Sequence, residues 1–192
     1  MITADKGGAP PEFLAALRSL RATALRPEIH LEEAPGPGRI APWTAALTAE
    51  LVPARGSDQE SASGRFVVLH DPAGQEAWTG TFRLVTLTRA TLEAELGADP
   101  LLSEVAWSWL RDAMAEHGLD PDAAGGTVTR VISDSFGVLA ERRSEVEVEL
   151  RASWSPTSCD LSRDLRAWGT LLCTAAGLAP LPEGVTPLGP RR

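Results

Sequence analysis

The segment EVEVELRASW at positions 145–154 constrains the fold of this chain more than any other stretch. Apolar and polar side chains alternate along it, which is the pattern of a β-strand with one face on a core and the other in water. Pairing shifted by one residue would bury the carboxylates of Glu145, Glu147 and Glu149, so the register is strongly specified. Strands with one polar face are typical of antiparallel sheets. The side chains expected in the core are Val146, Val148, Leu150, Ala152 and Trp154.

Other segments predict further strands and helices. Strand-like patterns occupy residues 43–52, 65–70, 81–88 and 127–133, and RPEIHLEE allows a short edge strand at 28–33. Apolar residues recur at helical spacing in residues 11–25, 98–119 and about 160–176.

The order of these elements is α-β(β)ββ-α-ββ-α, without alternation of single strands and helices. It predicts one α+β domain over residues 11–178, in which an antiparallel sheet of five or six strands carries three helices packed mainly on one face. Residues 1–10 and the Pro/Gly-rich residues 179–192 are expected to be flexible tails.

The helix predicted at 98–119 has signals at both ends. Asp99 is suited to cap its first turn, Pro100 fits the first helical position, and Gly118 stands where a left-handed residue ends many helices. Trp107 and Met114 lie together on a flank away from its core stripe. Burial of such side chains gains much free energy, so either another element of the chain covers them or they border a surface for a partner or a second copy. The core stripe comprises Leu102, Val105, Ala106, Trp109 and Ala113.

The stretch HDPAGQEAW at 70–78 concentrates polar side chains. The Asp, Pro and Gly of DPAG occupy the positions that a type I turn prefers, so backbone geometry accounts for them. We expect the following residues to begin the next strand, which sets His70 opposite Gln75 or Glu76. Such a pair is either an exposed cross-strand contact or a general acid–base couple, with Asp71 as a further candidate. No nucleophile or oxyanion donor accompanies it in the sequence.

Several chemistries find no support in the sequence. His30, His70 and His117 are far apart, and the usual zinc-ligand spacings are missing, so we expect no metal site and no cofactor. Neither a glycine-rich phosphate loop nor a Gly-x-Ser-x-Gly nucleophile elbow is present. A formal charge of −8 with scattered arginines opposes binding to nucleic acid, because phosphates attract cations.

The sequence also predicts a compartment. No segment approaches the roughly 20 apolar residues of a membrane span, and arginines and prolines interrupt any signal-peptide core. Cys159 and Cys173 are 14 residues apart, which is about 21 Å along one helix and too far for a disulfide. Two free thiols and no export signal predict a cytoplasmic protein without membrane contact.

Longer blocks of the sequence resemble a known family. The segments RPEIHLEEAP, HDPAGQEAWTGTFRLVT, DPLLSEVAWSWL, GGTVTRVISDSFG and LLCTAAGLAP fall within about residues 12–180. Together they resemble the actinobacterial domain-of-unknown-function family numbered 3000, which implies a cytosolic actinobacterial protein and brings no established activity, cofactor or catalytic residue. The element order is also similar to the fold of type III secretion chaperones, which implies a dimeric module that binds protein segments.

The sequence therefore predicts a cytosolic, non-enzymatic module that binds a protein partner or a second copy of itself, with Trp107 and Met114 at the contact. The alternative is a small enzyme with an acid/base site of His70, Asp71 and Glu76 at the 70–78 hairpin. The two differ in shape, because an enzyme needs a concave pocket where polar groups converge, whereas an adaptor presents a flatter apolar patch.

Overall fold

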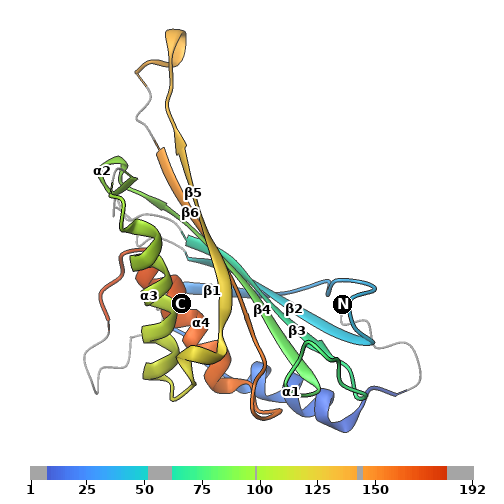
Figure 1. The fold of residues 1–192 in the computed structure, drawn as a ribbon. Helices are drawn as coiled ribbons and strands as arrows, with labels where there is room; N and C mark the ends of the chain where they lie inside the picture. Colours follow the sequence, from blue (N-terminus) through green and yellow to red (C-terminus); the bar gives the residue numbers. More distant parts are fainter. Residues whose placement is uncertain (1–7, 52–61, 98, 142–144, 181–192) are drawn as a thin grey trace, which may run out of the picture.

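The computed structural model describes residues 8–51, 62–97, 99–141 and 145–180, and within them the chain forms an α+β fold (Figure 1). Six strands form one antiparallel sheet in the order β1-β2-β3-β4-β6-β5, which confirms the predicted fold class. The strands are β1 (Ile29–Ala34), β2 (Trp43–Leu51), β3 (Ala62–His70), β4 (Phe82–Leu92), β5 (Gly125–Ser133) and β6 (Glu145–Trp154). The helices are α1 (Pro11–Ala22), α2 (Ala94–Gly97), α3 (Leu102–Glu116) and α4 (Ser162–Ala175), with short 3-10 turns η1 (Pro121–Ala123) and η2 (Gly137–Leu139).

The three longer helices lie on one face of the sheet (Figure 1). α4 packs against β3 and β4, α3 packs against α4 and against β5 and β6, and α1 contacts α4. Gly118 ends α3 as expected, with a φ of 70° in the left-handed region that favours glycine. The backbone N–H of Leu119 donates to the carbonyl of Met114 at 2.9 Å and completes this helix end.

The core fills the space between the sheet and the helical layer. The register predicted for β6 is confirmed, because its apolar side chains are buried while Glu145 and Glu147 are exposed. The apolar stripe predicted for the last helix is buried as well. The buried side chains of β6 and this helix are Val146, Val148, Leu150, Ala152, Trp154, Leu161, Leu165, Trp168 and Leu172.

The segment after the DPAG turn is not the strand that the sequence predicts. β4 begins at Phe82, which pairs with His70, so residues 75–81 belong to a loop. Two successive turns build this loop, with hydrogen bonds of 2.9 Å from Gly74 N to Asp71 O and from Trp78 N to Gln75 O. Trp78 packs on a small apolar cluster on the sheet face opposite the helices, formed by Ala46, Val67 and Leu69. This contact holds the segment out of the strand.

The helix predicted at 98–119 begins later than expected, at Leu102, and the separate turn α2 precedes it. The predicted start signals are wrong in their positions, because Leu101 is the N-cap of α3, no side chain caps the helix, and Pro100 lies in the turn before it. Asp99 orders that turn instead, since its Oδ1 accepts the backbone N–H of Leu101 at 2.8 Å. The first helix ends at Ala22 rather than at residue 25. The predicted tails at 1–10 and 179–192 lie largely outside the described residues. Among the residues that are described, no helix has the length and apolarity to cross a membrane.

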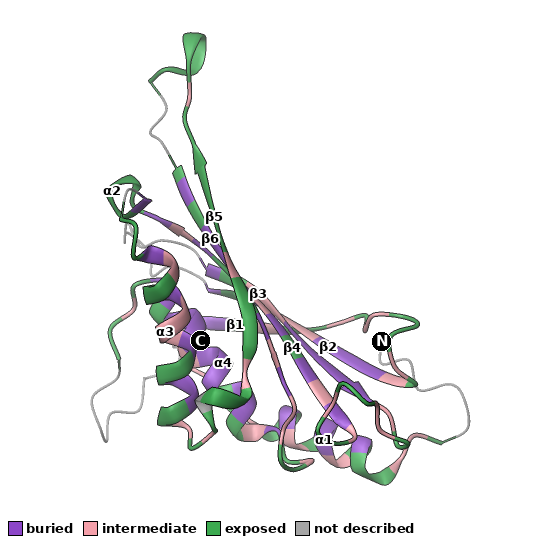
Figure 2. Cartoon of the chain, in the orientation of Figure 1, coloured by how far each residue is buried: buried purple, intermediate pink, exposed green. Residues whose placement is uncertain are grey.

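The β5–β6 hairpin projects well beyond the rest of the molecule (Figure 1). β5 is exposed along almost its whole length, whereas β6 alternates between exposed and buried residues from its outer end at Glu145 (Figure 2). Among the described strands β5 is also an edge strand, because it pairs there only with β6. The hairpin therefore presents side chains on two faces and a free backbone edge.

Candidate functional site

His70, the first candidate for acid–base chemistry, is sealed inside the protein with no exposed surface. Its ring stacks between Phe13, with centroids 5.9 Å apart, and Phe82, with centroids 4.2 Å apart. Nδ1 lies 3.0 Å from the carbonyl oxygen of Thr81, and because a carbonyl only accepts, Nδ1 carries the proton. Nε2 has no hydrogen-bond partner in the described part of the chain. Burial lowers the pKa of His70 and favours the neutral ring.

Asp71 and Glu76 do not join His70 in a site. Asp71 holds the turn, since its Oδ1 accepts the N–H of Ala73 at 3.0 Å and its Oδ2 accepts the side-chain amide of Gln75 at 3.3 Å. Glu76 is exposed in the loop, and no hydrogen bond joins it to His70 among the described contacts. The three side chains therefore do not converge on a common point.

Trp107 and Met114 are covered mainly by their own chain. Met114 is 1% exposed in the core, and Trp107 is half-buried against it. The Trp107 ring packs on Gly126 of β5, where an added Cβ would lie 2.9 Å from Cζ3 of Trp107. The absence of a side chain at Gly126 thus lets the edge strand approach the helix. Met114 presents no contact surface to a partner.

The exposed apolar side chains gather instead on the projecting hairpin. We call this set the hairpin surface, and its most exposed members are Phe136, at 80%, and Val138, which is fully exposed. Further exposed apolar residues belong to α2, α3 and the turn between them, and both helices contact β5. The hairpin surface comprises Val131, Ile132, Phe136, Val138 and Leu139, and the neighbouring residues are Leu96, Leu101 and Val105.

An acidic row lies beside the hairpin surface. Glu145, Glu147 and Glu149 share one face of β6, directly next to β5. Glu149 is neutralised by Arg89 at 2.6 Å and Arg151 at 2.6 Å. Burial opposes the charge of Glu149, but the hydrogen bonds from the two arginines prevail and lower its pKa. Within the described residues, Glu145 and Glu147 form no ion pair, although the charge of Glu147 acts on Arg89, and both carboxylates border β5.

The sequence contained one signal for the hairpin surface that pattern analysis missed. The segment SFGVLA at 135–140 places several apolar residues between two strands, where turns usually carry polar residues.

For metals, no group of three or more His, Cys, Asp or Glu side chains in the described ranges is arranged to hold an ion. The two cysteines, Cys159 and Cys173, are free, and burial raises the pKa of the Cys173 thiol to about 11.

Comparison with known proteins gives the family of the chain. Residues 9–186 match the model of the family described as "Protein of unknown function (DUF3000)", and the chain belongs to this family. No curated protein and no solved structure gives a significant match. The similarity to secretion chaperones thus rests on element order alone.

Proposed function

We propose that this member of the family is a non-enzymatic module that binds an extended segment of a partner protein along β5. The observation that carries the proposal is the exposed edge of β5, flanked by the apolar side chains of the hairpin surface. An edge strand offers unpaired N–H and C=O groups, and proteins commonly bind peptides by adding a strand there. Ile132 shares a face with Val146 of β6, so apolar side chains on that face of the added strand would cover it, whereas Val131 lies on the opposite face beside Glu147.

The charges favour a partner over a second copy. A strand added to β5 would lie about 10 Å from β6, and long basic side chains on the face of Glu145 and Glu147 would be attracted by these carboxylates. Two copies would each bring a formal charge of −8 and the same acidic row. The proposed partner therefore carries a segment in which apolar residues alternate with lysine or arginine.

The burial of His70 supports a binding role rather than acid–base catalysis at this hairpin, because a sealed imidazole cannot reach a substrate. The same proposal places the module in the cytoplasm. Its two free cysteines, Cys159 and Cys173, are typical of proteins in a reducing compartment.

A photo-cross-linking amino acid at Val131 or Val138 tests the proposal in the native cell. The matched control position is Ile40, which is 56% exposed and lies outside the hairpin, between β1 and β2. We expect adducts with another protein at both hairpin positions and none at Ile40, and mass spectrometry of the adducts to map to a basic, extended segment. Adducts between two copies of the chain would contradict binding of a different protein and would indicate a homodimer. Hairpin adducts no stronger than those at Ile40 would overturn the binding role.

A further inference from the structure

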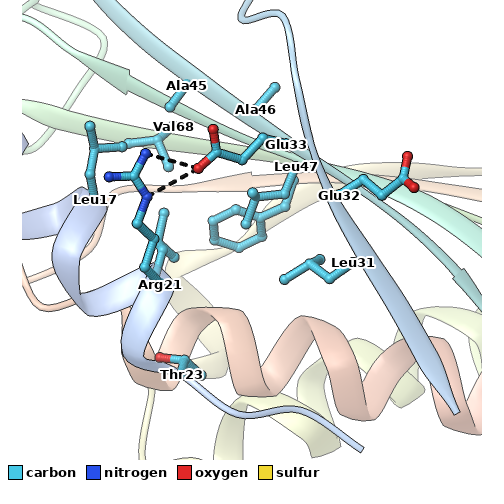
Figure 3. Close-up of a pocket in the computed structure, with 12 residues that line it drawn as sticks. Leu17, Arg21, Thr23, Leu31, Glu32, Glu33, Ala45, Ala46, Leu47 and Val68 are labelled. Atoms are coloured by element: carbon cyan, nitrogen blue, oxygen red, sulfur yellow. Dashed lines mark hydrogen bonds and ion pairs between the residues drawn. The ribbon is translucent and has the colours of Figure 1, made fainter. Parts of the chain in front are cut away.

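A second surface feature lies at the other edge of the sheet, remote from β5. Helix α1 and strands β1, β2 and β3 enclose a pocket of about 150 Å³ that opens to solvent (Figure 3). The small side chain of Ala45 leaves room on β2. Most of its lining is aliphatic or aromatic, and comprises Leu17, Leu20, Leu31, Leu47, Phe66 and Val68.

One ion pair lies beside this apolar pocket and joins its two walls. Arg21 of α1 donates from Nε and Nη2 to Oε1 of Glu33 of β1, at 3.0 and 2.9 Å (Figure 3). Both bonds end on the same carboxylate oxygen, so Oε2 of Glu33 and Nη1 of Arg21 have no hydrogen bond within the described residues. The two side chains are 59% and 45% exposed. An exposed pair of this kind contributes little to stability and can exchange partners readily.

We propose that the pocket binds an α-amino acid with an apolar side chain. A simple carboxylate would be attracted by Arg21 but repelled by Glu33. A simple ammonium group would be attracted by Glu33 but repelled by Arg21. A zwitterion satisfies both, because its carboxylate pairs with the guanidinium of Arg21 while its ammonium pairs with the carboxylate of Glu33.

The size of the pocket selects the side chain of the ligand. An engineered protein cavity of roughly 150 Å³ lined by similar residues binds benzene, so a leucine, isoleucine or phenylalanine side chain fits a space of this volume. Three more buried carbon atoms make L-leucine bind roughly 50-fold more tightly than L-alanine. The site is independent of β5, so its occupancy and the binding of a partner segment can be tested separately.

Calorimetric titration of the full chain with four ligands tests the proposal. We expect L-leucine to bind, and leucinamide, which lacks the carboxylate, and N-acetyl-leucine, which lacks the ammonium, each to lose at least tenfold in affinity. Equal binding of all three would show a pocket that recognises only apolar surface and would overturn the zwitterion. Equal affinities for L-alanine and L-leucine, or no binding of L-leucine at millimolar concentration, would contradict the assignment of the pocket as the binding site.

Variants of the ion pair separate recognition from folding. Arg21→Gln and Glu33→Gln should each lower the affinity for L-leucine at least tenfold. The double variant Arg21→Glu/Glu33→Arg should lower this affinity by as much, although it keeps an ion pair. Arg111→Gln is the control. Arg111 forms an exposed ion pair with Asp122, with 2.9 Å between Nη2 and Oδ1, and neither residue lines the pocket. Unchanged melting temperatures confirm folding. Affinity retained in the charge-reversed variant, or lost equally in Arg111→Gln, would contradict the assignment.

Discussion

Two buried tryptophans allow the strength of one core hydrogen bond to be measured. Trp154, at the end of β6, is 2% exposed and donates from Nε1 to Oδ1 of Asp164 at 2.7 Å. Asp164 lies in the first turn of α4 and is itself 2% exposed. Trp168 is fully buried, but its Nε1 has no partner among the described atoms. Replacing either tryptophan by phenylalanine deletes the same atoms, and only one replacement breaks a hydrogen bond.

We expect Trp154→Phe to lower the free energy of unfolding by more than Trp168→Phe. A hydrogen bond to a charged group contributes about 1.5–3 kcal/mol, and its loss leaves the buried Asp164 carboxylate without the donor of Trp154. The difference between the variants should therefore be about 1.5–3 kcal/mol. For a domain of this length each kcal/mol corresponds to about 2–4 °C, so the melting temperatures should differ by about 3–12 °C.

Urea unfolding followed by circular dichroism measures both free energies under one set of conditions. Because packing is lost in both variants, the comparison isolates the indole N–H, provided the m-values agree. Equal destabilisation of the two variants would refute the reasoning, since it would mean that the bond between Trp154 and Asp164 adds nothing beyond packing.

The variant Asp164→Asn provides a second arm of the same experiment. Burial raises the pKa of Asp164, so between the unfolded and folded pKa values the folded state binds more protons. This group therefore stabilises the fold less as pH rises through that window, from about pH 4 upward. Asparagine keeps an acceptor for Trp154 and carries no charge, so Asp164→Asn should lose little stability at pH 7 and should flatten this part of the pH profile.

Two further predictions concern His70 and Gly64. Because the pKa of His70 is lowered in the folded protein, the unfolded state binds more protons between the folded pKa and the unfolded pKa of about 6.5. The stability that neutral His70 contributes is therefore present above this range and is lost as pH falls through it. His70→Phe should accordingly lose less stability than wild type between pH 8 and pH 5. Equal losses in urea titrations would contradict this. Gly64→Ala should cost about 1–3 kcal/mol, because its Cβ would lie 2.5 Å from the carbonyl oxygen of Leu87 and 2.8 Å from Trp168. Gly80→Ala, with open space around its Cβ, should change the free energy by less than about 0.5 kcal/mol, and a similar cost for both would disprove the packing argument.

The parts of the fold that the sequence predicts best are those fixed by local periodicity. The alternation in β6 sets both its register and its buried face, because a slip would bury carboxylates. Segment 75–81 fails for a physical reason, since its apparent strand pattern is overridden by the contact of Trp78 with Ala46, Val67 and Leu69. Those partners lie on β2 and β3, and sequence spacing does not show such a contact.

The candidate sites depend on tertiary placement even more strongly. Arg21 and Glu33 belong to a helix and a strand, and only the packing of α1 on the sheet brings them to 2.9 Å. In the same way, the sequence predicts Met114 outside the core stripe of the helix and Val105 within it, but Met114 is buried in the core and Val105 is 41% exposed. Trp107 is half-buried and packs on Gly126 of β5. Exposure, which decides whether an apolar residue can contact a partner, was thus the least predictable property.

The β5–β6 hairpin extends beyond the end of α3 (Figure 1). At helical rise the 15 residues of α3 span about 22 Å, whereas the 10 residues of β6 span about 34 Å at strand rise. α2 covers the outer end of β6, where Val146 is 1% exposed, and β5 at the edge of the sheet keeps little cover. β6 adapts to solvent there, with Glu145 and Glu147 on its open face, but β5 keeps Val131 and Ile132 exposed at 46% and 55%. Solvation alone would favour polar residues on both strands, and the difference between them is the reason to expect a partner on β5.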